Sequence, residues 1–302
     1  MSEQAADAPV VVVTGANGFV GAATCAALVE RGARVRGVVR RAGTAPSGVE
    51  ERVGEFSDPG FAASVVDGAS AVVTTVHPMA ADRETQHRVG VEGTTTIARA
   101  ARDAGVRRLV HVSTAAVYDR SPGADDVDES SALVGEDAGD YGVTKRDTDA
   151  SLAAVEAITR VLVRPPAILG PGATSVWNTL RPGAIRENPA ARRTAPDRSF
   201  AWVHVTDLAT FLADVATGAV PDAEDPARGP VAGECTPVNL AAEPARARDY
   251  FGTVAEAVGV EPEWVEEPVW TGRIVADRAR GWGWSPAVTL DAALTELAEG
   301  LR

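Results

Sequence analysis

The sequence predicts an α/β protein with a doubly wound parallel sheet. Two observations predict this class. Short runs of β-branched residues alternate with longer helical patterns along the N-terminal part of the chain, as in βαβ units. A glycine-spaced turn also joins the first run directly to the first helical pattern, where sheets of this class bind their ligands.

The elements are expected in a regular order. Residues 10–13 (V-V-V-V) form a continuous β-branched run, typical of a strand buried on both faces, and the helical pattern that follows ends at Gly32. Residues 34–39 alternate as a second strand. The remaining strands, each a short run rich in valine, are expected at 71–76, 109–113, 161–164, 203–205 and 238–240. The remaining helices follow apolar patterns at 91–105, 207–216, 247–258 and 290–301.

The composition limits the function. Of 302 residues, 45% are hydrophobic and 24% charged, and the formal net charge is −13. Such an acidic chain has no general affinity for nucleic acid or acidic membranes, and no apolar run approaches the roughly 20 residues of a membrane span. Neither the two cysteines nor the four histidines have metal-type spacing, so no metal is expected. The polar, acidic N-terminus is unlike a signal or transit peptide, which favours a cytoplasmic location.

The first motif is the turn T-G-A-N-G-F-V-G at residues 14–21. Gly15, Gly18 and Gly21 are spaced G-x-x-G-x-x-G between the first strand and the first helix. Glycine permits a tight bend and a close approach of the backbone to a pyrophosphate, and the helix N-terminus adds free N–H groups. In this context the motif predicts a dinucleotide-binding domain of the Rossmann type.

The end of the second expected strand indicates which dinucleotide binds. A site for NAD carries Asp or Glu there to accept the ribose hydroxyls. Here Val39 is followed by Arg40 and Arg41, which can pair with a 2′-phosphate. NADP(H) is therefore the expected cofactor, with NAD(H) as the alternative.

The second motif is D-Y-G-V-T-K at residues 140–145. Lys145 is the only lysine among 29 basic residues, and it follows Tyr141, one of three tyrosines, by four positions on a predicted helix. A nearby ammonium favours the phenolate and lowers the pKa of a tyrosine from about 10. A solvated helix face is the alternative explanation. Tyr141 and Lys145 are thus candidate catalytic residues.

The strand at 109–113 ends in two hydroxyl residues, Ser113 and Thr114. A hydroxyl at this edge of the sheet could hold a substrate oxygen while Tyr141 exchanges a proton, although hydroxyls also serve there as plain caps.

Together these motifs resemble the extended class of the short-chain dehydrogenase/reductase superfamily, which includes NAD(P)-dependent epimerases/dehydratases and dihydroflavonol-reductase-like enzymes. The matching stretches are residues 14–21, 106–118, 141–145, 164–172, 200–209 and 283–286. The resemblance implies that Thr114 is the catalytic hydroxyl, that Tyr141 exchanges the proton, and that Lys145 holds the nicotinamide ribose. It also implies an adenine contact by Glu55 and Phe56, and cofactor contacts by His77 and by residues 165–168.

On these grounds two sets of site residues are expected. The catalytic set is Ser113, Thr114, Tyr141 and Lys145. The cofactor-binding set is Gly15, Asn17, Gly18, Phe19, Val20, Gly21, Arg40, Arg41, Glu55, Phe56, Thr75, Val76, His77, Tyr141, Lys145, Pro165, Ala167 and Ile168.

The sequence departs from the pattern of this superfamily at two places, and these departures limit the type of reaction that is expected. Gly90 stands near a place where many nucleotide-sugar enzymes of this superfamily carry Asn. Ala115 and Ala116 follow the catalytic hydroxyl, where the dehydratases carry an acidic pair, so dehydration is not expected.

The expected function is an NADP(H)-dependent oxidoreductase that interconverts a carbonyl and an alcohol by hydride transfer, using Thr114, Tyr141 and Lys145. A nucleotide-sugar epimerase with tightly held NAD(P) is the alternative, and its diphosphate could be bound by a cluster of arginines: Arg181, Arg186, Arg192, Arg193 and Arg198. A non-catalytic NADP-sensing protein is the third possibility, disfavoured because Tyr141 and Lys145 are both present. A small-molecule substrate is expected as the partner, with no nucleic acid or membrane, and a homodimer is possible.

The pattern also divides the chain. Residues 9–170 with 200–242 are assigned to the dinucleotide-binding domain, and residues 171–199 with 243–302 to a small substrate-binding region. The acidic segment 119–140 lacks an apolar period and is predicted to form a mobile flap over the substrate entrance.

Overall fold

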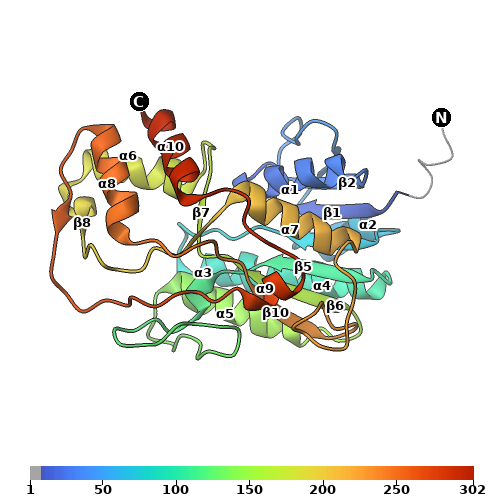
Figure 1. Cartoon of the computed structure of the whole chain (residues 1–302). Coiled ribbons are helices and arrows are strands. Elements are labelled where there is room, and N and C mark those ends of the chain that lie inside the picture. The colour runs from blue at the N-terminus through green and yellow to red at the C-terminus, as the bar shows by residue number, and fades with distance from the viewer. Residues whose placement is uncertain (1–7) are drawn as a thin grey trace.

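The computed structural model describes residues 8–302, and its central feature is a parallel sheet with helices on both faces (Figure 1). The seven strands follow the order β10-β6-β5-β4-β1-β2-β3, and each neighbouring pair is parallel. They are β1 (Val10–Thr14), β2 (Arg34–Val39), β3 (Glu50–Val53), β4 (Ala71–Thr74), β5 (Arg108–Val112), β6 (Thr159–Arg164) and β10 (Cys235–Asn239). The predicted doubly wound sheet is confirmed.

The strand order reverses between β1 and β4. The chain leaves β1 for β2 on one side and later returns to β4 on the other side. Ligands of doubly wound sheets bind outside the carboxyl ends of the strands at such a switch point.

Alternate residues of β1 face opposite layers. Val11 and Val13 belong to the apolar core under α1 (Phe19–Glu30) and α7 (Val205–Thr217), on one face of the sheet. Val12 belongs to the core on the other face. That face is covered by α2 (Pro59–Val66), α4 (Thr94–Asp103) and α5 (Asp140–Ala153). The all-valine run reflects this burial on both faces.

Strand β3 and helix α2 are two of the elements that were not predicted from the sequence. Strand β3 has the sequence E-E-R-V, and its residues are exposed or half-buried because it forms the edge of the sheet. Helix α2 follows it, with Asp58 accepting a hydrogen bond from the Phe61 amide and Pro59 at the first turn.

The strand expected at 203–205 lies outside the central sheet. It is β9 (Trp202–His204), which pairs with β7 (Ala167–Leu169) in a separate two-stranded sheet. Val203 is buried in the core under α1 and α7, and Trp202 is buried in a separate core. Periodicity alone cannot distinguish such a buried run from a central strand.

A third core lies at the end of the molecule that carries the C-terminus. It is formed by α6 (Arg181–Glu187), α8 (Ala247–Val258) and α10 (Leu290–Leu301), which lie together in Figure 1. Its largest buried side chains are Trp202 and Tyr250. Short strands β8 (Arg193–Thr194) and β11 (Glu263–Trp264) pair nearby.

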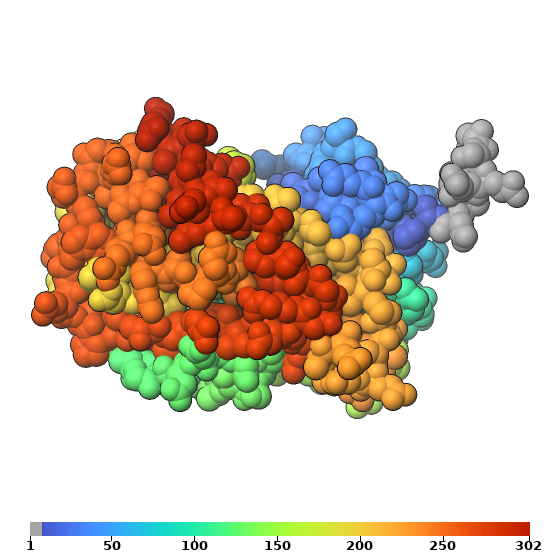
Figure 2. Space-filling view, viewed as in Figure 1, coloured from blue at the N-terminus to red at the C-terminus, as the bar shows by residue number. Residues whose placement is uncertain are grey.

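The acidic segment 119–140 is tied to the C-terminal chain at its middle. The Val127 amide donates to the Arg273 carbonyl at 2.8 Å, and the Val275 amide donates to the Val127 carbonyl at 2.7 Å. Asp126 also pairs with Arg273. Figure 2 shows the orange-to-red C-terminal chain packed against the green atoms of this part. The Asn239 amide also donates to Glu129 at 2.8 Å. Mobility of the segment remains a prediction, and these contacts would restrain it.

Helix α3 (Arg83–Gln86) and a π-helical turn (His87–Gly93) lead into α4, and α9 (Asp277–Gly281) lies near β10. Over residues 8–302, none of the helices has both the length and the apolar character required to cross a membrane.

Candidate active site

A cleft of about 860 Å³ lies at the carboxyl edge of the sheet, over the switch point. Every cofactor-binding residue predicted from the sequence lines this cleft, except Lys145 and Pro165. Of the predicted catalytic residues, Thr114 and Tyr141 line it. The structure therefore brings together residues from β2, α1, α5 and the turns after β1, β4 and β5, which are far apart in the chain.

The glycine turn is shaped for a phosphate group. Gly15 has a φ of +66°, and a Cβ on Gly21 would lie 2.1 Å from the Gly15 carbonyl oxygen. Side chains at these positions would fill the cradle or force it open. Gly18 caps α1 in an extended conformation, so the first free amides of α1 begin at the cleft. This geometry fits the pyrophosphate of a dinucleotide.

The end of β2 presents two free guanidinium groups. Val39 is buried, whereas Arg40 and Arg41 are exposed and line the cleft. The loop after them is held by Glu51 on β3, which accepts from the amides of residues 43, 44 and 45 at 2.9–3.0 Å. These hydrogen bonds lower the pKa of the Glu51 carboxyl. No carboxylate within residues 8–302 pairs with Arg40 or Arg41, which leaves both available to an anionic ligand.

Tyr141 lies at the start of α5 beside Thr114, which follows β5. Burial raises the pKa of Tyr141, and the neighbouring Thr114 hydroxyl acts in the opposite direction. The lowered pKa expected from the spacing of Tyr141 and Lys145 is therefore not found, because burial outweighs the neighbouring groups. A protonated Tyr141 is suited to donate a proton.

His77 packs edge-on against the Tyr141 ring, with the ring centroids 5.3 Å apart. Its Nε2 lies 3.1 Å from Gln86 Oε1. Burial, followed by the charge of Lys145, lowers the pKa of His77 to about 3, so the ring is neutral. A Cβ on Gly90 would lie 2.7 Å from His77 Nδ1. Gly90 stands near a place where many nucleotide-sugar enzymes of the superfamily carry Asn. A side chain at residue 90 would collide with the His77 ring, so this position requires glycine.

Lys145 lies beneath the cleft and is only 2% exposed. Its Nζ donates to the Val112 carbonyl oxygen at 2.6 Å and lies 3.4 Å from His111 Nε2. Burial lowers the pKa of Lys145 to about 8, while the carboxylate of Asp149 raises it. Lys145 is therefore next to the site but does not form its surface.

Ser113 and Pro165 do not line the cleft; they lie behind the residues that do. The Ser113 hydroxyl lies beside the buried Asp149, which pairs with Arg164 at 3.0 Å. Consecutive residues of an extended chain point to opposite sides, so only Thr114 of the two hydroxyl residues faces the cleft. Pro165 is buried and accepts from the Ala115 amide, and Pro166 lines the cleft in its place.

The five arginines expected as a diphosphate site are dispersed. Arg181 stacks on Trp177 and Phe251, Arg192 donates to the Ile185 carbonyl, and Arg198 pairs with Glu267. Neither these three nor Arg186 and Arg193 line the cleft.

Several residues that line the cleft were not predicted from the sequence. Trp177 and Phe200 form an aromatic wall with the buried Tyr250. Arg120 also lines the cleft, directly after the A-A-V-Y-D stretch. Trp177 lies in a stretch without periodicity, and nothing local distinguishes Arg120 from the other 27 arginines. The contacts of these residues come from distant segments.

The fold and the site define a dinucleotide-binding protein of the extended short-chain dehydrogenase/reductase superfamily. Residues 11–223 match the NAD dependent epimerase/dehydratase family, and the chain belongs to this family.

Characterised relatives include reductases. The chain is 33% identical over 175 residues to the 2-alkyl-3-oxoalkanoate reductase of Stenotrophomonas maltophilia, covering 54% of this chain and 52% of the relative. It is 36% identical over 169 residues to a Stigmatella aurantiaca enzyme, covering 52% and 50%. That enzyme is named 4-hydroxy-2-methyl-3-oxo-4-farnesyl-3,4-dihydroquinoline-1-oxide ketoreductase. The chain thus matches about half the length of these relatives.

A solved structure shows the same fold. The Bordetella bronchiseptica enzyme WbmG in complex with NAD superposes with a TM-score of 0.76 at 20% identity, covering 97% of this chain and 94% of WbmG.

Proposed function

We propose that this protein is an NADP(H)-dependent oxidoreductase that interconverts a carbonyl compound and its alcohol. The observation that carries the proposal is the pair of Thr114 and Tyr141, which meet in the same cleft as the glycine turn. The relatives named as ketoreductase and as oxoalkanoate reductase support the same type of reaction.

The chain would hold the cofactor along the cleft. The glycine turn and the amides of α1 receive the pyrophosphate, Glu55 and Phe56 line the adenine end, and Arg40 and Arg41 pair with the 2′-phosphate. When bound, the cofactor supplies or accepts the hydride. Lys145 supports the site from below, where its ammonium stabilises the negative charge that develops at Tyr141.

The substrate would be oriented by two hydroxyl groups. Thr114 holds the substrate oxygen by a hydrogen bond, and Tyr141 donates its phenolic proton to that oxygen as the alcohol forms. Burial keeps Tyr141 protonated beforehand, so the proton is available near neutral pH. His77 packs against the phenol ring and limits its movement.

The epimerase alternative has less support from the site. The five arginines that could have held a diphosphate lie outside the cleft. A non-catalytic sensor would not require Tyr141, Thr114 and Lys145 to meet at one place.

The test is net consumption of NADPH with a panel of ketones and aldehydes, compared with interconversion of nucleotide sugars. Tyr141→Phe should lower kcat by about 10²- to 10⁴-fold and leave NADPH binding intact, since only the proton is lost. Tyr250→Phe is the matched control, because it removes a phenol hydroxyl that donates to the Trp177 carbonyl behind the aromatic wall and keeps the ring that packs on Phe200. Full activity in Tyr141→Phe, or sugar interconversion without NADPH consumption, would overturn the proposal.

A further inference from the structure

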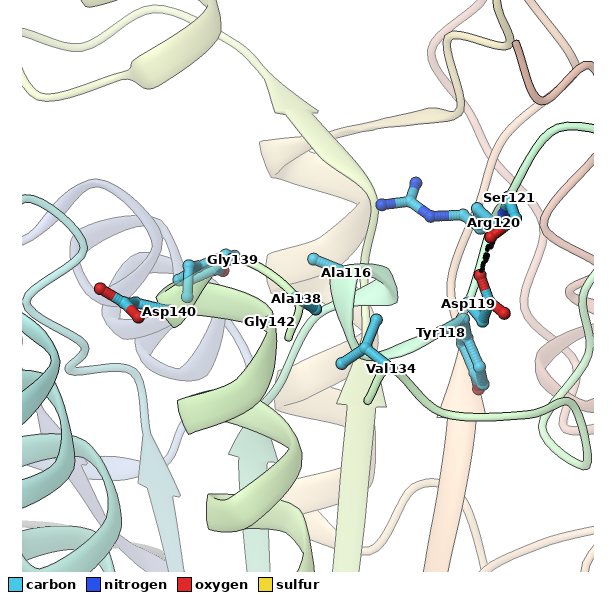
Figure 3. Close-up of a pocket in the computed structure, with 11 residues that line it drawn as sticks. Ala116, Tyr118, Asp119, Arg120, Ser121, Val134, Ala138, Gly139, Asp140 and Gly142 are labelled. Atoms are coloured by element: carbon cyan, nitrogen blue, oxygen red, sulfur yellow. Dashed lines mark hydrogen bonds between the residues drawn. The ribbon is translucent and has the colours of Figure 1, made fainter. Parts of the chain in front are cut away.

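A second pocket of about 540 Å³ adjoins the cleft (Figure 3). Ala116, Arg120 and Tyr141 line both spaces, so a ligand held in this pocket reaches the catalytic tyrosine. The rest of the pocket comes from residues 118–121 and 134–142.

Arg120 is the cation of this pocket, and its guanidinium is free. It forms no hydrogen bond or ion pair with any residue from 8 to 302, and burial lowers its pKa. It lies over the Trp270 ring, 5.6 Å from the centroid, and the Trp270 Nε1 donates to the Asp125 carbonyl at 3.0 Å. The ring is therefore fixed, and it holds the guanidinium in place by a cation–π contact.

The two carboxylates of the pocket are engaged elsewhere. Asp119 accepts from the amide and the hydroxyl of Ser121 at 3.0 and 2.5 Å. Asp140 lies 3.9 Å from Arg83. Figure 3 shows the Arg120 guanidinium extending toward Ala116, the Asp119 carboxylate bonded to Ser121, and the Asp140 carboxylate on the far side of the pocket. A half-buried guanidinium without a partner is costly, and an anionic ligand would remove that cost.

The surroundings favour a single negative charge on that ligand. Asp119 and Asp140 line the same pocket as this single guanidinium, and their charges would repel a phosphate dianion or a diphosphate more strongly than a carboxylate. The planar fork of arginine also matches the two oxygens of a carboxylate. The adjoining cleft wall at Trp177 and Phe200 is aromatic and suits the apolar part of the same molecule.

We propose that Arg120 is a specificity-determining residue that binds a substrate carboxylate, so that the preferred substrates are oxo acids with an apolar or aromatic part. The proposal rests on the proposed reductase function for its chemistry. It assigns the second pocket to the carboxylate and the cleft to the carbonyl.

The kinetic test compares each of two oxo acids with its methyl ester, following NADPH consumption. In benzoylformate the ketone adjoins the carboxylate, and in levulinate the two groups are separated. The wild type should prefer the acid of at least one pair. Arg120→Met should lower kcat/KM for that acid by about tenfold or more and leave the ester unchanged, because one charged hydrogen-bonded contact is lost.

Two further variants complete the comparison. Arg120→Lys should recover part of the acid preference, since it keeps the charge but not the fork. Arg193→Met is the matched control, because Arg193 is exposed and lines neither space. Equal use of acid and ester by the wild type, or an equal loss on both in Arg120→Met, would overturn the proposal.

Calorimetric titration separates this proposal from the reductase function. Benzoylformate or levulinate, at up to about 10 mM, should bind the NADP⁺-saturated wild type and not Arg120→Met, even if neither compound is reduced. Failure of reduction with this binding intact would count against the reductase function alone. Absence of binding for both acids would overturn the assignment of Arg120. Tighter, Arg120-dependent binding of uridine diphosphate would also overturn it, by assigning the pocket to a diphosphate.

Discussion

The ammonium of Lys145 donates to the carbonyl oxygen of Val112 at 2.6 Å, which places the only lysine of the chain inside the protein. The contact joins α5 to the end of β5, directly before the Ser113–Thr114 step. Lys145 therefore fixes the distance between the helix that carries Tyr141 and the strand that presents Thr114.

Replacing Lys145 tests this role in turnover. Lys145→Arg keeps the positive charge, but its planar fork is too large for the space beside Val112 and His111, so we expect kcat to fall by about 10²-fold or more. The measurement is steady-state kinetics with any carbonyl substrate that the wild type reduces. Arg102→Lys on the exposed face of α4 is the control. Near-normal turnover in Lys145→Arg would show that a compact ammonium is not required.

The buried ammonium also makes stability depend on pH. Burial lowers the pKa of Lys145 to about 8, below the value of a free lysine. Between about pH 8 and 10.4 the unfolded chain binds more protons at this residue, so its contribution to the free energy of unfolding rises with pH. Below about pH 8 the residue is protonated in both states, and the cost of burying the charge is constant.

Comparison with Lys145→Met isolates this effect. From roughly pH 7.5 to 9.5 the free energy of unfolding of the wild type should rise by about 2 kcal/mol relative to the variant. Urea denaturation at both pH values provides the measurement. Parallel pH curves for the two proteins would mean that the lysine has an ordinary pKa when folded.

Arg40 is expected to select the phosphate-bearing cofactor. Its guanidinium lines the cleft without a carboxylate partner within the described chain. Arg40→Asp should weaken NADPH binding by about tenfold or more and improve NADH binding, because a carboxylate repels the 2′-phosphate and accepts from ribose hydroxyls. Dissociation constants from fluorescence titration test this. Arg34→Asp makes the same charge change at the opposite end of β2 and should leave the preference unaltered. A wild type that binds NADH at least as tightly as NADPH would contradict the assignment.

Gly21 is expected to tolerate no side chain. A Cβ there would lie 2.1 Å from the Gly15 carbonyl oxygen, and backbone cannot move aside as a flexible side chain can. Gly21→Ala should therefore destabilise the protein by about 1–3 kcal/mol and abolish cofactor binding. Gly252→Ala in α8, where nothing lies within 4 Å of the added carbon, should instead stabilise it by about 0.5–1 kcal/mol. Thermal unfolding and NADPH titration of both variants distinguish the two cases, and equal stability of both would refute the steric argument.

The sequence by itself determined the sheet, the glycine turn and the Tyr141–Lys145 pair. Each of these depends on residues close together in the chain, where strand and helix periods fix which side chains share a face. The valine run of β1 identifies a strand buried on both faces, and the four-residue spacing places Tyr141 and Lys145 on one side of α5. Edge strand β3 was missed because an exposed strand needs no apolar run.

Only the tertiary structure decided which groups meet across long separations. In the folded chain Thr114 faces the cleft and Ser113 does not, and Lys145 is buried against Val112. The tertiary structure also placed Arg120 over Trp270 and dispersed the five arginines that the sequence had grouped. Such contacts depend on how the connecting loops pack, and the local propensities and spacing that a sequence reveals do not specify that packing.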